Sequence, residues 1–440
     1  MEAKPVATMT NEAFSEKTSG HPTKKTIRKG TTWYSSVIII VNAAVGGGIL
    51  NFPQSYHLAG GILTAGIMQA VLGVVAIGSL IMLAYCADYA KANSFQETLK
   101  RCCGHVVHTV CAITLAMFTF GVCVTYLVVI GDMWDKVFEF AISDPEVRQS
   151  WFLDRRFIIT LTSLALILPI SFPKRIAFLR YPSALGMIGV FYVVVLIVVQ
   201  YFMDLPPRGY IKQSPDSWSD IFYVLPAICF GYQCHINSVP VYAELRGRPN
   251  LRLYGLVAGL GIGVTFIIYF GVGTFGYLSF GSHCSADILV NYPPTLHVIV
   301  GLAMLAVNIY SSYPIYEFCG RSAISTVLIQ YCGWSAEKWS SIERRFRYIS
   351  TVVWYTVSLL LALFVPNIGP LIGLMGSLAA FFVFSYPGLA LLSVMLQVKP
   401  EKVNVRHKAL MAVSIFYILL GVFFFGLTFS QAVVQIIRTV

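Results

Sequence analysis

Charged residues are scarce in this chain. Asp, Glu, Lys and Arg make up 12% of its 440 residues, whereas an ordinary soluble protein carries about 25%. Hydrophobic residues make up 57%, and they form continuous runs of roughly 20 residues rather than an alternating pattern. The shortage of charge excludes a soluble globular protein, and the continuous runs disfavour a membrane β-barrel. Together they predict an all-α polytopic membrane protein.

Features of secreted proteins and of enzymes are also missing. The chain has no Asn-x-Ser/Thr sequon, and of its ten cysteines only Cys284 falls clearly in an expected outer loop. We therefore expect neither N-glycosylation nor a disulfide framework. The polar residues 1–30 do not resemble a cleavable signal peptide. Without an embedded His/Glu metal motif or a Ser/His/Asp arrangement with assignable roles, we expect no catalytic residue, no transition-metal site and no enzyme.

Eleven apolar runs organise the rest of the chain. They lie at about 33–57, 60–87, 106–138, 157–172, 182–203, 220–242, 252–280, 295–332, 348–365, 368–396 and 409–431. We expect them to form eleven transmembrane helices in one domain over residues 31–431. Residues 1–30, which are poor in apolar side chains, are expected to form a disordered tail. Residues 432–440 would form a short tail on the opposite side of the membrane.

Basic residues indicate the orientation. With the N-terminus in the cytoplasm, 24 of the 31 Lys and Arg residues lie in the N-terminal tail and the inner loops, and 7 lie on the outer side. This asymmetry follows the positive-inside rule. It predicts a cytoplasmic N-terminus, an odd number of spans and a luminal or extracellular C-terminus. It also accounts for the net charge of +11 without a nucleic-acid partner.

The first apolar run contains a sequence that disfavours a continuous helix. Residues 42–53 read Asn-Ala-Ala-Val-Gly-Gly-Gly-Ile-Leu-Asn-Phe-Pro, and both consecutive glycines and proline weaken a helix interior. Unpaired backbone groups are costly in lipid, so a break here must line a polar cavity or a binding site. We expect the N–H groups at Gly46, Gly47 and Gly48 to hold a substrate carboxylate at the positive end of the following half-helix. Close helix packing through small residues is the alternative.

A second interruption occurs five runs later. Residues 225–240 carry Gly231 near their midpoint, followed by polar residues. Broken segments at corresponding positions of two halves favour an inverted-repeat secondary transporter with its site at the membrane midplane. The repeats would span about 33–203 and 220–396, with an additional helix at about 409–431.

Polar side chains on the eighth run indicate a candidate cation site. Asn308, Ser311 and Ser312 lie at positions i, i+3 and i+4, and so share one helix face. Their oxygens, together with Asn42 and the carbonyl freed near Val45, are ligands that suit a small hard cation such as sodium. The alternative is that these side chains bond to their own helix or to a neighbouring helix.

Further candidates for the substrate site lie in the sixth and third runs. Gln233 and His235 are polar groups at the midpoint of the sixth run, where polarity is expensive and usually functional. Backbone at this break would bind the substrate amine, and His235 would sense pH or relay a proton. A packed, neutral histidine is the alternative. Tyr126 and Phe230 are expected to form walls of the cavity.

Embedded or membrane-edge acids form a candidate gate. Glu317 lies inside the eighth run with Arg321 four residues later, and Glu244 lies beside Arg246 and Arg248 at the end of the sixth. The i, i+4 spacing places Glu317 and Arg321 on one helix face. We expect an internal ion pair or a cytoplasmic gate here, rather than a substrate ligand.

Four stretches resemble a known family. Residues 42–53 resemble the first span of the amino acid/auxin permease superfamily. Residues 230–242, 313–321 and 121–132 are similar to the sixth, eighth and third spans of solute carrier family 38, the sodium-coupled neutral amino acid transporters, especially its seventh and eighth members. The resemblance covers roughly residues 30–431. It implies a fold like that of the bacterial leucine transporter, with five-plus-five inverted repeats whose first and sixth helices are broken.

The resemblance also implies a function. It implies ion-coupled transport of glutamine, asparagine or other neutral amino acids across a lysosomal or plasma membrane. It also implies that sodium is held by Asn42 and by Ser311 or Ser312. Two alternatives stay open: a proton-coupled amino acid permease, and an amino-acid sensor or scaffold without net flux that docks through residues 1–30. The expected partners are a neutral amino acid and the lipid bilayer. The coupling ion, sodium or a proton, would be the only cofactor, and the sequence leaves the oligomeric state open.

Overall fold

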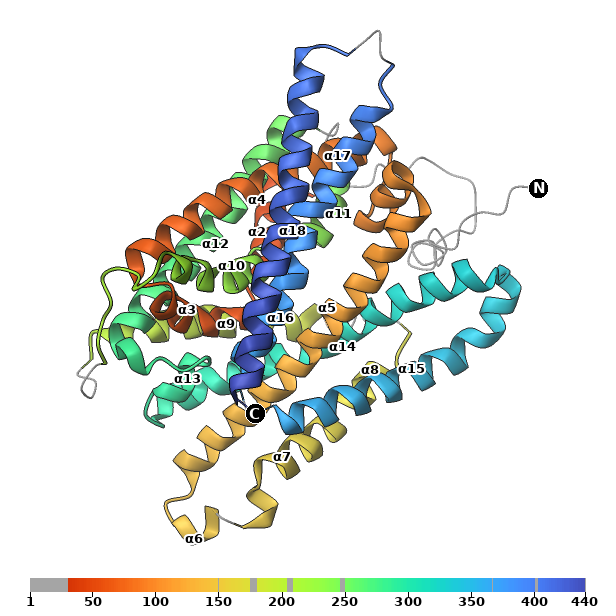
Figure 1. Cartoon of the computed structure of the whole chain (residues 1–440). Helices are drawn as coiled ribbons and strands as arrows, with labels where there is room; N and C mark the ends of the chain where they lie inside the picture. Colours follow the sequence, from red (N-terminus) through yellow and green to blue (C-terminus); the bar gives the residue numbers. More distant parts are fainter. Residues whose placement is uncertain are drawn as a thin grey trace.

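The computed structural model describes residues 31–439, apart from 149, 175–179, 204–208, 246–249, 366 and 400–402. The expected disordered tail at residues 1–30 lies outside the described residues. Within them the chain is helical (Figure 1), and the one isolated β-bridge pairs Thr31 with Leu245. The all-α class predicted from the sequence is therefore confirmed.

The helices follow one another along the chain. Their bounds are α2 Trp33–Ala44, η1 Gly47–Asn51, α3 Phe52–Leu58, α4 Ile62–Ala90, α5 Phe95–Ala141, α6 Pro145–Arg148, η2 Trp151–Leu153, α7 Arg155–Thr162, η3 Ser163–Ile167, α8 Leu168–Ser171, α9 Arg180–Tyr201, η5 Trp218–Val224, α10 Leu225–Gly231, α11 His235–Glu244, α12 Leu251–Phe280, η6 Gly281–His283, α13 Ile288–Asn291, α14 Leu296–Cys332, α15 Ala336–Phe364, α16 Ile368–Ala380, η7 Phe381–Ser385, α17 Tyr386–Leu396 and α18 Val405–Thr439. The segments η3 and η7 are π-helical turns inside longer helices, a form common at functional sites and kinks.

Seven of the described helical segments are long and apolar enough to cross a membrane. They are α4, α5, α12 with η6, α14, α15, α16 with η7 and α17, and α18. The bent combination of α2 with η1 and α3 makes an eighth if it is counted as one span. The predicted runs at 157–172, 182–203 and 220–242 are helical but short or interrupted. A count of eleven spans therefore stays a prediction.

Three of the described helices are much longer than the hydrocarbon core of a bilayer: α5, α14 and α18, the last with 35 residues. Helix α5 has 47 residues and α14 has 37, which is about 70 and 55 Å of helix against about 30 Å of hydrocarbon. Helix α5 is kinked at Gly104, whose φ of 86° is a left-handed conformation that glycine adopts without strain. Helices α5 and α14 pack along each other, and α14 also packs against α9. This crossing forms the centre of the molecule (Figure 1).

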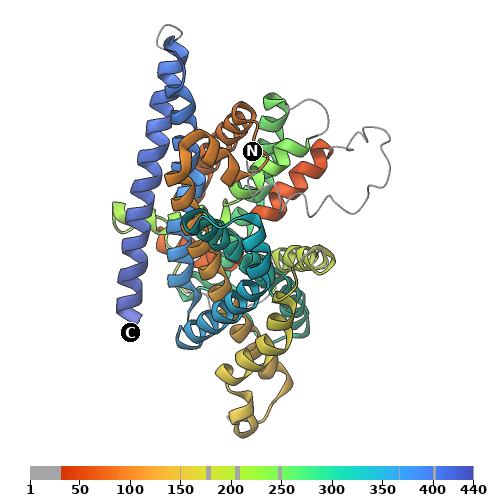
Figure 2. The same cartoon turned by 90° about the vertical axis from the view of Figure 1, so that its right-hand side faces the viewer.

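The remaining helices pack around that crossing. Helix α12 packs against α4, α2 and α3, while α16 packs against α10 and α18. Figure 2 shows α18 standing along one edge of the molecule, with α17 beside it. The two predicted broken segments are thereby held between α12 on one side and α16 on the other.

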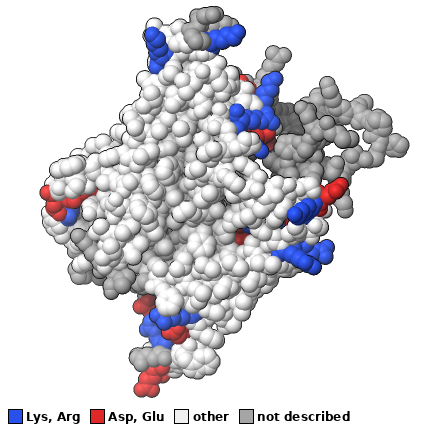
Figure 3. Space-filling model, turned by 45° about the vertical axis from the view of Figure 1, so that its right-hand side comes forward, with Lys and Arg blue, Asp and Glu red and all other residues white. Residues whose placement is uncertain are grey.

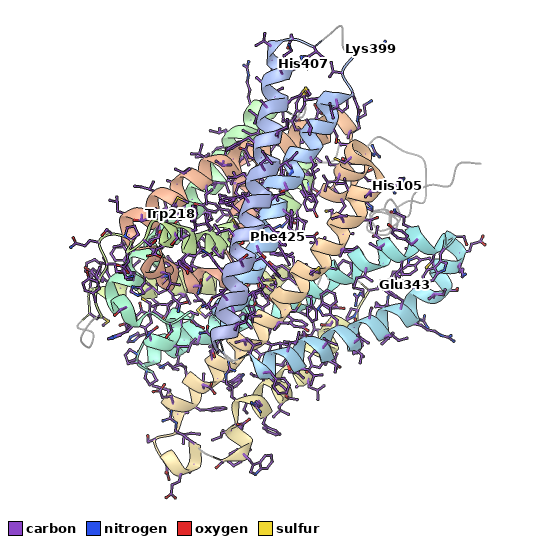
Figure 4. The ribbon with its side chains drawn as sticks, viewed as in Figure 1. His105, Trp218, Glu343, Lys399, His407 and Phe425 are labelled. Atoms are coloured by element: carbon purple, nitrogen blue, oxygen red, sulfur yellow. The ribbon has the colours of Figure 1, made fainter. Side chains whose placement is uncertain are left out.

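On the face that Figure 3 shows, charged side chains lie around the edges and leave a broad uncharged area between them. Figure 4 places Lys399 and His407 at the connection from α17 to α18, and Glu343 on α15. Trp218 of η5 lies at the left of the same view, across the molecule from Glu343. A broad uncharged surface is suited to contact with the hydrocarbon of a lipid bilayer.

Candidate functional site

The first predicted break lies at Val45 and Gly46. Helix α2 ends at Ala44, and the following segment of η1 and α3 is bent away by 56°. The Tyr269 hydroxyl of α12 donates to the carbonyl oxygen of Ala44 at 2.8 Å, which satisfies one of the acceptors that the break exposes. The bend is therefore held by a contact between helices, and not by the glycines alone.

Two backbone donors where η1 begins have no hydrogen-bond acceptor among the described residues. The first hydrogen bond of η1 runs from the Ile49 N–H to the Gly46 carbonyl, at 3.1 Å. The N–H groups of Gly47 and Gly48 precede that bond and have no acceptor within the helix. Because η1 continues into α3, both donors stand at the start of the segment Gly47–Leu58, where the helix dipole favours an anion.

Each glycine of this break has different surroundings. A Cβ atom on Gly48 would lie 2.5 Å from Cδ1 of Phe230, and one on Gly47 would lie 3.2 Å from Cε1 of Tyr126. A Cβ atom on Gly46 would meet nothing within 4 Å. Packing therefore requires glycine at position 48, whereas Gly46 borders open space beside the free N–H groups.

The second predicted break lies at residues 232–234, between α10 and α11. Helix α10 packs against η1, so the two breaks lie together. The side-chain amide nitrogen of Gln233 is buried and has no hydrogen-bond partner among the described residues. A buried donor of this kind is unfavourable unless a ligand or water supplies an acceptor. Gln233 therefore offers an unused donor at the second break.

Aromatic side chains form the walls around the first break. Tyr126 of α5 packs edge-on against Tyr316 of α14, with ring centroids 5.7 Å apart. The Phe230 ring lies 6.0 Å from that of Phe118. The Ser312 side chain of α14 also lies close to the phenol of Tyr126. The structure thus brings both predicted wall residues to the first break and connects one of them to the predicted cation ligands.

Tyr316 is a wall residue that the sequence analysis does not identify. It lies four residues after Ser312, and so shares the face of α14 that carries the predicted cation ligands. This spacing is a signal that could have identified it. Tyr269, which holds the first break, has no comparable signal, because it lies 225 residues along the chain from the Ala44 carbonyl it contacts.

His235 contacts α4. Its Nε2 lies 2.7 Å from the Ser79 hydroxyl oxygen, and its side chain is fully buried. Its Nδ1 has no partner among the described residues. The structure thus places His235 between α11 and α4, in the packed arrangement that the sequence analysis leaves open. A role for His235 in substrate binding or proton relay stays a prediction.

The predicted cation ligands are only partly assembled. On α14 the Ser311 hydroxyl donates to the backbone carbonyl of Asn308 at 3.0 Å, and the Ser312 hydroxyl donates to the Asn308 side-chain oxygen at 3.3 Å. Bonding within one helix is the alternative that such residues always have. Asn42 is exposed on α2, which packs against α12 and α11. Val45 is buried at the break.

Two of the predicted gate residues form a buried ion pair. The Arg321 Nη1 lies 2.9 Å from the Glu317 Oε1. The Thr351 hydroxyl of α15 donates to the same oxygen, also at 2.9 Å. Arg321 also donates to the carbonyl of Ser171 in α8, at 3.4 Å. The expected internal pair is therefore present, and it joins α14 to α15 and α8.

Glu244, the other gate candidate, is exposed at the end of α11. Its backbone carbonyl accepts the Thr31 N–H at 2.7 Å, which ties the entry of α2 to the end of α11. Arg246 and Arg248, its predicted neighbours, lie outside the described residues. A gate role for these residues stays a prediction.

Comparison with known proteins identifies the family. The family model described as transmembrane amino acid transporter protein matches residues 29–432. Sodium-coupled neutral amino acid transporter 7 of Danio rerio is 38% identical over 92% of this chain and 88% of its own length. Its Homo sapiens counterpart is 36% identical over the same shares. Solute carrier family 38 member 8 of Homo sapiens is 34% identical over 90% of this chain and 93% of its own length.

Among solved structures, MhsT in complex with L-phenylalanine aligns with a TM-score of 0.48 and 14% identity, over 93% of this chain and all of that one. The family model covers nearly the whole chain, and the curated relatives align along most of their own length. The chain therefore belongs to the transmembrane amino acid transporter family, a family of transporters and not of enzymes, and within it to solute carrier family 38, where it is similar to the seventh and eighth members.

Proposed function

We propose that this protein is a secondary active transporter of neutral α-amino acids, coupled to sodium. The relatives that it matches are named sodium-coupled neutral amino acid transporters. The observation that supports the proposal most directly is the pair of free N–H groups at Gly47 and Gly48 beside the open space at Gly46. Backbone donors at a helix start suit the carboxylate that every α-amino acid carries.

The substrate side chain would lie against Tyr126, Phe230 and Tyr316. None of these walls carries a charge at neutral pH, so an uncharged substrate side chain enters without an unpaired ion. The unused amide nitrogen of Gln233 would donate a hydrogen bond to an acceptor such as a side-chain carbonyl oxygen. Glutamine and asparagine carry that oxygen, and we propose them as the preferred substrates.

Sodium would bind where the first break meets α14. Asn308, Ser311 and Ser312 offer oxygens on one helix face, and the carbonyl at Val45 and the Asn42 side chain would complete the site. Asn42 is exposed in this structure, so its participation requires α2 to move toward α14. We propose that this movement is part of alternating access, in which one half of a five-plus-five repeat of eleven spans rocks against the other around the site.

Uptake by proteoliposomes that contain the full chain tests this function. Radiolabelled glutamine should accumulate under an inward sodium gradient, and replacing sodium with choline should abolish accumulation. Accumulation in choline under a proton gradient would instead establish the proton-coupled permease. Binding of glutamine without flux under either gradient would establish a sensor. Localisation of the tagged chain would decide between the lysosomal and the plasma membrane, with the N-terminus expected in the cytoplasm.

A further inference from the structure

The loop between α12 and α14 is docked against the first broken helix. Asn51 of η1 donates to the carbonyl of Ala286 at 3.2 Å, and Gln54 of α3 donates to the carbonyl of Cys284 at 3.4 Å. Helix α13, which belongs to this loop, packs against both η1 and α5. Cys284 and Ala286 are buried as a result. The 284–291 loop thus covers the half of the broken helix that follows the glycines.

The docked loop buries a carboxyl group. Asp287 is 4% exposed, and its Oδ1 accepts the Leu289 N–H at 2.9 Å as the N-cap of α13. Within the described residues no Lys or Arg forms an ion pair with Asp287. A buried carboxylate is stabilised by two or three such hydrogen bonds or by a basic partner. With a single cap bond, the charged form of Asp287 is unfavourable in the docked loop.

The charged groups that face Asp287 come from α5. They are Asp132 and Lys136. Asp132 is paired with Arg155 of α7 at 2.6 Å, and Lys136 is paired with Glu139 at 3.0 Å. Both nearby basic groups therefore already have acidic partners, so Asp287 meets the negative charge of Asp132 without a basic group of its own.

Among the described residues, the other elements around the loop add no further counter-charge to Asp287. Arg155 also pairs with Asp135, at 3.2 Å. Helix η1 contributes Asn51, and α16 contributes Gly369 against Ala286, neither of which titrates. His283, which precedes the loop in η6, is exposed. The pKa of Asp287 is raised to about 7, first by burial and then by the Asp132 carboxylate. The Leu289 N–H and Lys136 lower this pKa, but by smaller amounts.

We propose that the 284–291 loop takes up a proton at Asp287 when it docks over the first broken helix, and that loss of this proton releases the loop. The acid is neutral when docked and ionises readily in water, where Asp titrates near pH 4. Docking is therefore fully favoured below about pH 4. The equilibrium constant for docking falls by about tenfold per pH unit between about pH 4 and about pH 7. Above about pH 7 the docked form also ionises, and the constant no longer changes.

Only the effect of the loop on transport rests on the proposed function; the docking of the loop does not. If the chain transports, release of the loop uncovers the path to Gly46, and acidity on that side of the membrane holds the path closed. Docking itself is a property of the loop and needs no flux. A measurement of docking can therefore fail or succeed independently of a transport assay.

Native cysteines report on docking. Cys284, the first residue of the docked loop, is buried, whereas Cys332 at the end of α14 is exposed. Free thiols react as thiolates, so the ratio of labelling at Cys284 to labelling at Cys332 corrects for the pH dependence of the reagent. The full chain would be reconstituted in lipid nanodiscs, labelled with a small maleimide between pH 5 and 8.5, and digested for mass spectrometry of the two peptides.

The labelling ratio should rise by about tenfold per pH unit from pH 5 to 7 and then level off. Asp287→Asn keeps the cap oxygen but cannot ionise, so its ratio should stay low and flat. Asp132→Asn removes the negative charge that faces Asp287 and so lowers the pKa of Asp287 in the docked loop. The labelling ratio should therefore level off at a lower pH. Asp144→Asn is the matched control, since Asp144 caps α6 in the same way at an exposed position, and it should behave like the unmodified chain.

A ratio that does not change with pH in the unmodified chain would overturn the proposal. The same conclusion would follow if Asp287→Asn retained the slope of the unmodified chain. Should Asp287→Asn fail to fold, as judged by size-exclusion chromatography, the slope of the unmodified chain and the shift in Asp132→Asn still decide the question. An unshifted plateau in Asp132→Asn would then count against it.

Discussion

Phe230 of α10 lies directly against Gly48 of η1: a Cβ atom at position 48 would be 2.5 Å from Cδ1 of the ring and 2.6 Å from Cε1. The two helix breaks are therefore in direct contact, although they lie in the first and sixth apolar runs of the chain. Such a connection is what a single site built from both breaks requires.

Gly48→Ala should disrupt this contact. Forcing a methyl group into a packed interior costs about 1–3 kcal/mol, so we expect a lower thermal unfolding midpoint in detergent and loss of glutamine uptake. Gly259→Ala on α12 is the matched control, because a Cβ atom there meets nothing within 4 Å. The double variant Gly48→Ala with Phe230→Leu should regain part of the lost stability. A Gly48→Ala protein as stable and active as the control would refute the contact.

Ser79 and His235 should behave as one unit. Ser79 is the partner of the buried His235 Nε2, and its hydroxyl also donates to the Ala76 carbonyl at 2.8 Å. Leaving Nε2 unpaired in Ser79→Ala costs about 1–3 kcal/mol. Ser79→Ala and His235→Ala should each lower the unfolding midpoint, and the double variant should lose less than the two effects added together. Additive losses would show that the contact carries no coupling. A change in the KM for glutamine in His235→Ala but not in Ser79→Ala would restore the substrate role for His235.

Removing one partner of the Glu317–Arg321 pair should be severe. Glu317→Gln leaves Arg321 charged and buried, and breaking a buried pair costs about 3–5 kcal/mol. The double variant Glu317→Gln with Arg321→Met should recover part of this loss, since no uncompensated charge remains. Lys174→Ala removes an exposed pair to Glu343 that is worth at most about 1 kcal/mol, and serves as the control. Equal unfolding midpoints for Glu317→Gln and Lys174→Ala would contradict the structural role.

Ser312→Ala should weaken the proposed sodium site. We expect the sodium concentration for half-maximal uptake to rise by about tenfold, which corresponds to about 1.4 kcal/mol, while uptake at saturating sodium falls less. Thr326→Ala is the control, because Thr326 lies on the same helix and also bonds back to it, at the carbonyl of Ser322. Unchanged sodium dependence in Ser312→Ala would remove this residue from the site.

The helical class and both interruptions could be predicted because their causes are local. Runs of apolar residues determine where a helix is stable in lipid, and three glycines near Pro53 weaken the helix wherever they occur. Asn308, Ser311 and Ser312 could likewise be placed on one face from their spacing alone. These features depend on a few neighbouring residues, and the sequence shows them directly.

The partners of the site residues could not be predicted, because they come from distant parts of the chain. Nothing near Ala44 indicates that Tyr269 will bind its carbonyl, and nothing near His235 indicates Ser79 as its partner. Asn42 has the right chemistry for a cation ligand, yet its exposure depends on how α2 is packed against α12 and α11. Such contacts are fixed by tertiary packing, which local pattern does not encode.

Competition of glutamine uptake by a carboxylate-free analogue tests the central claim most directly. Proteoliposomes of the full chain would take up radiolabelled glutamine under a sodium gradient in the presence of excess asparagine or of glutaminol, the alcohol that lacks the carboxylate. If the free N–H groups of Gly47 and Gly48 bind the carboxylate, asparagine should block the uptake and glutaminol should not. No sodium-driven uptake, or equal inhibition by both compounds, would contradict the account.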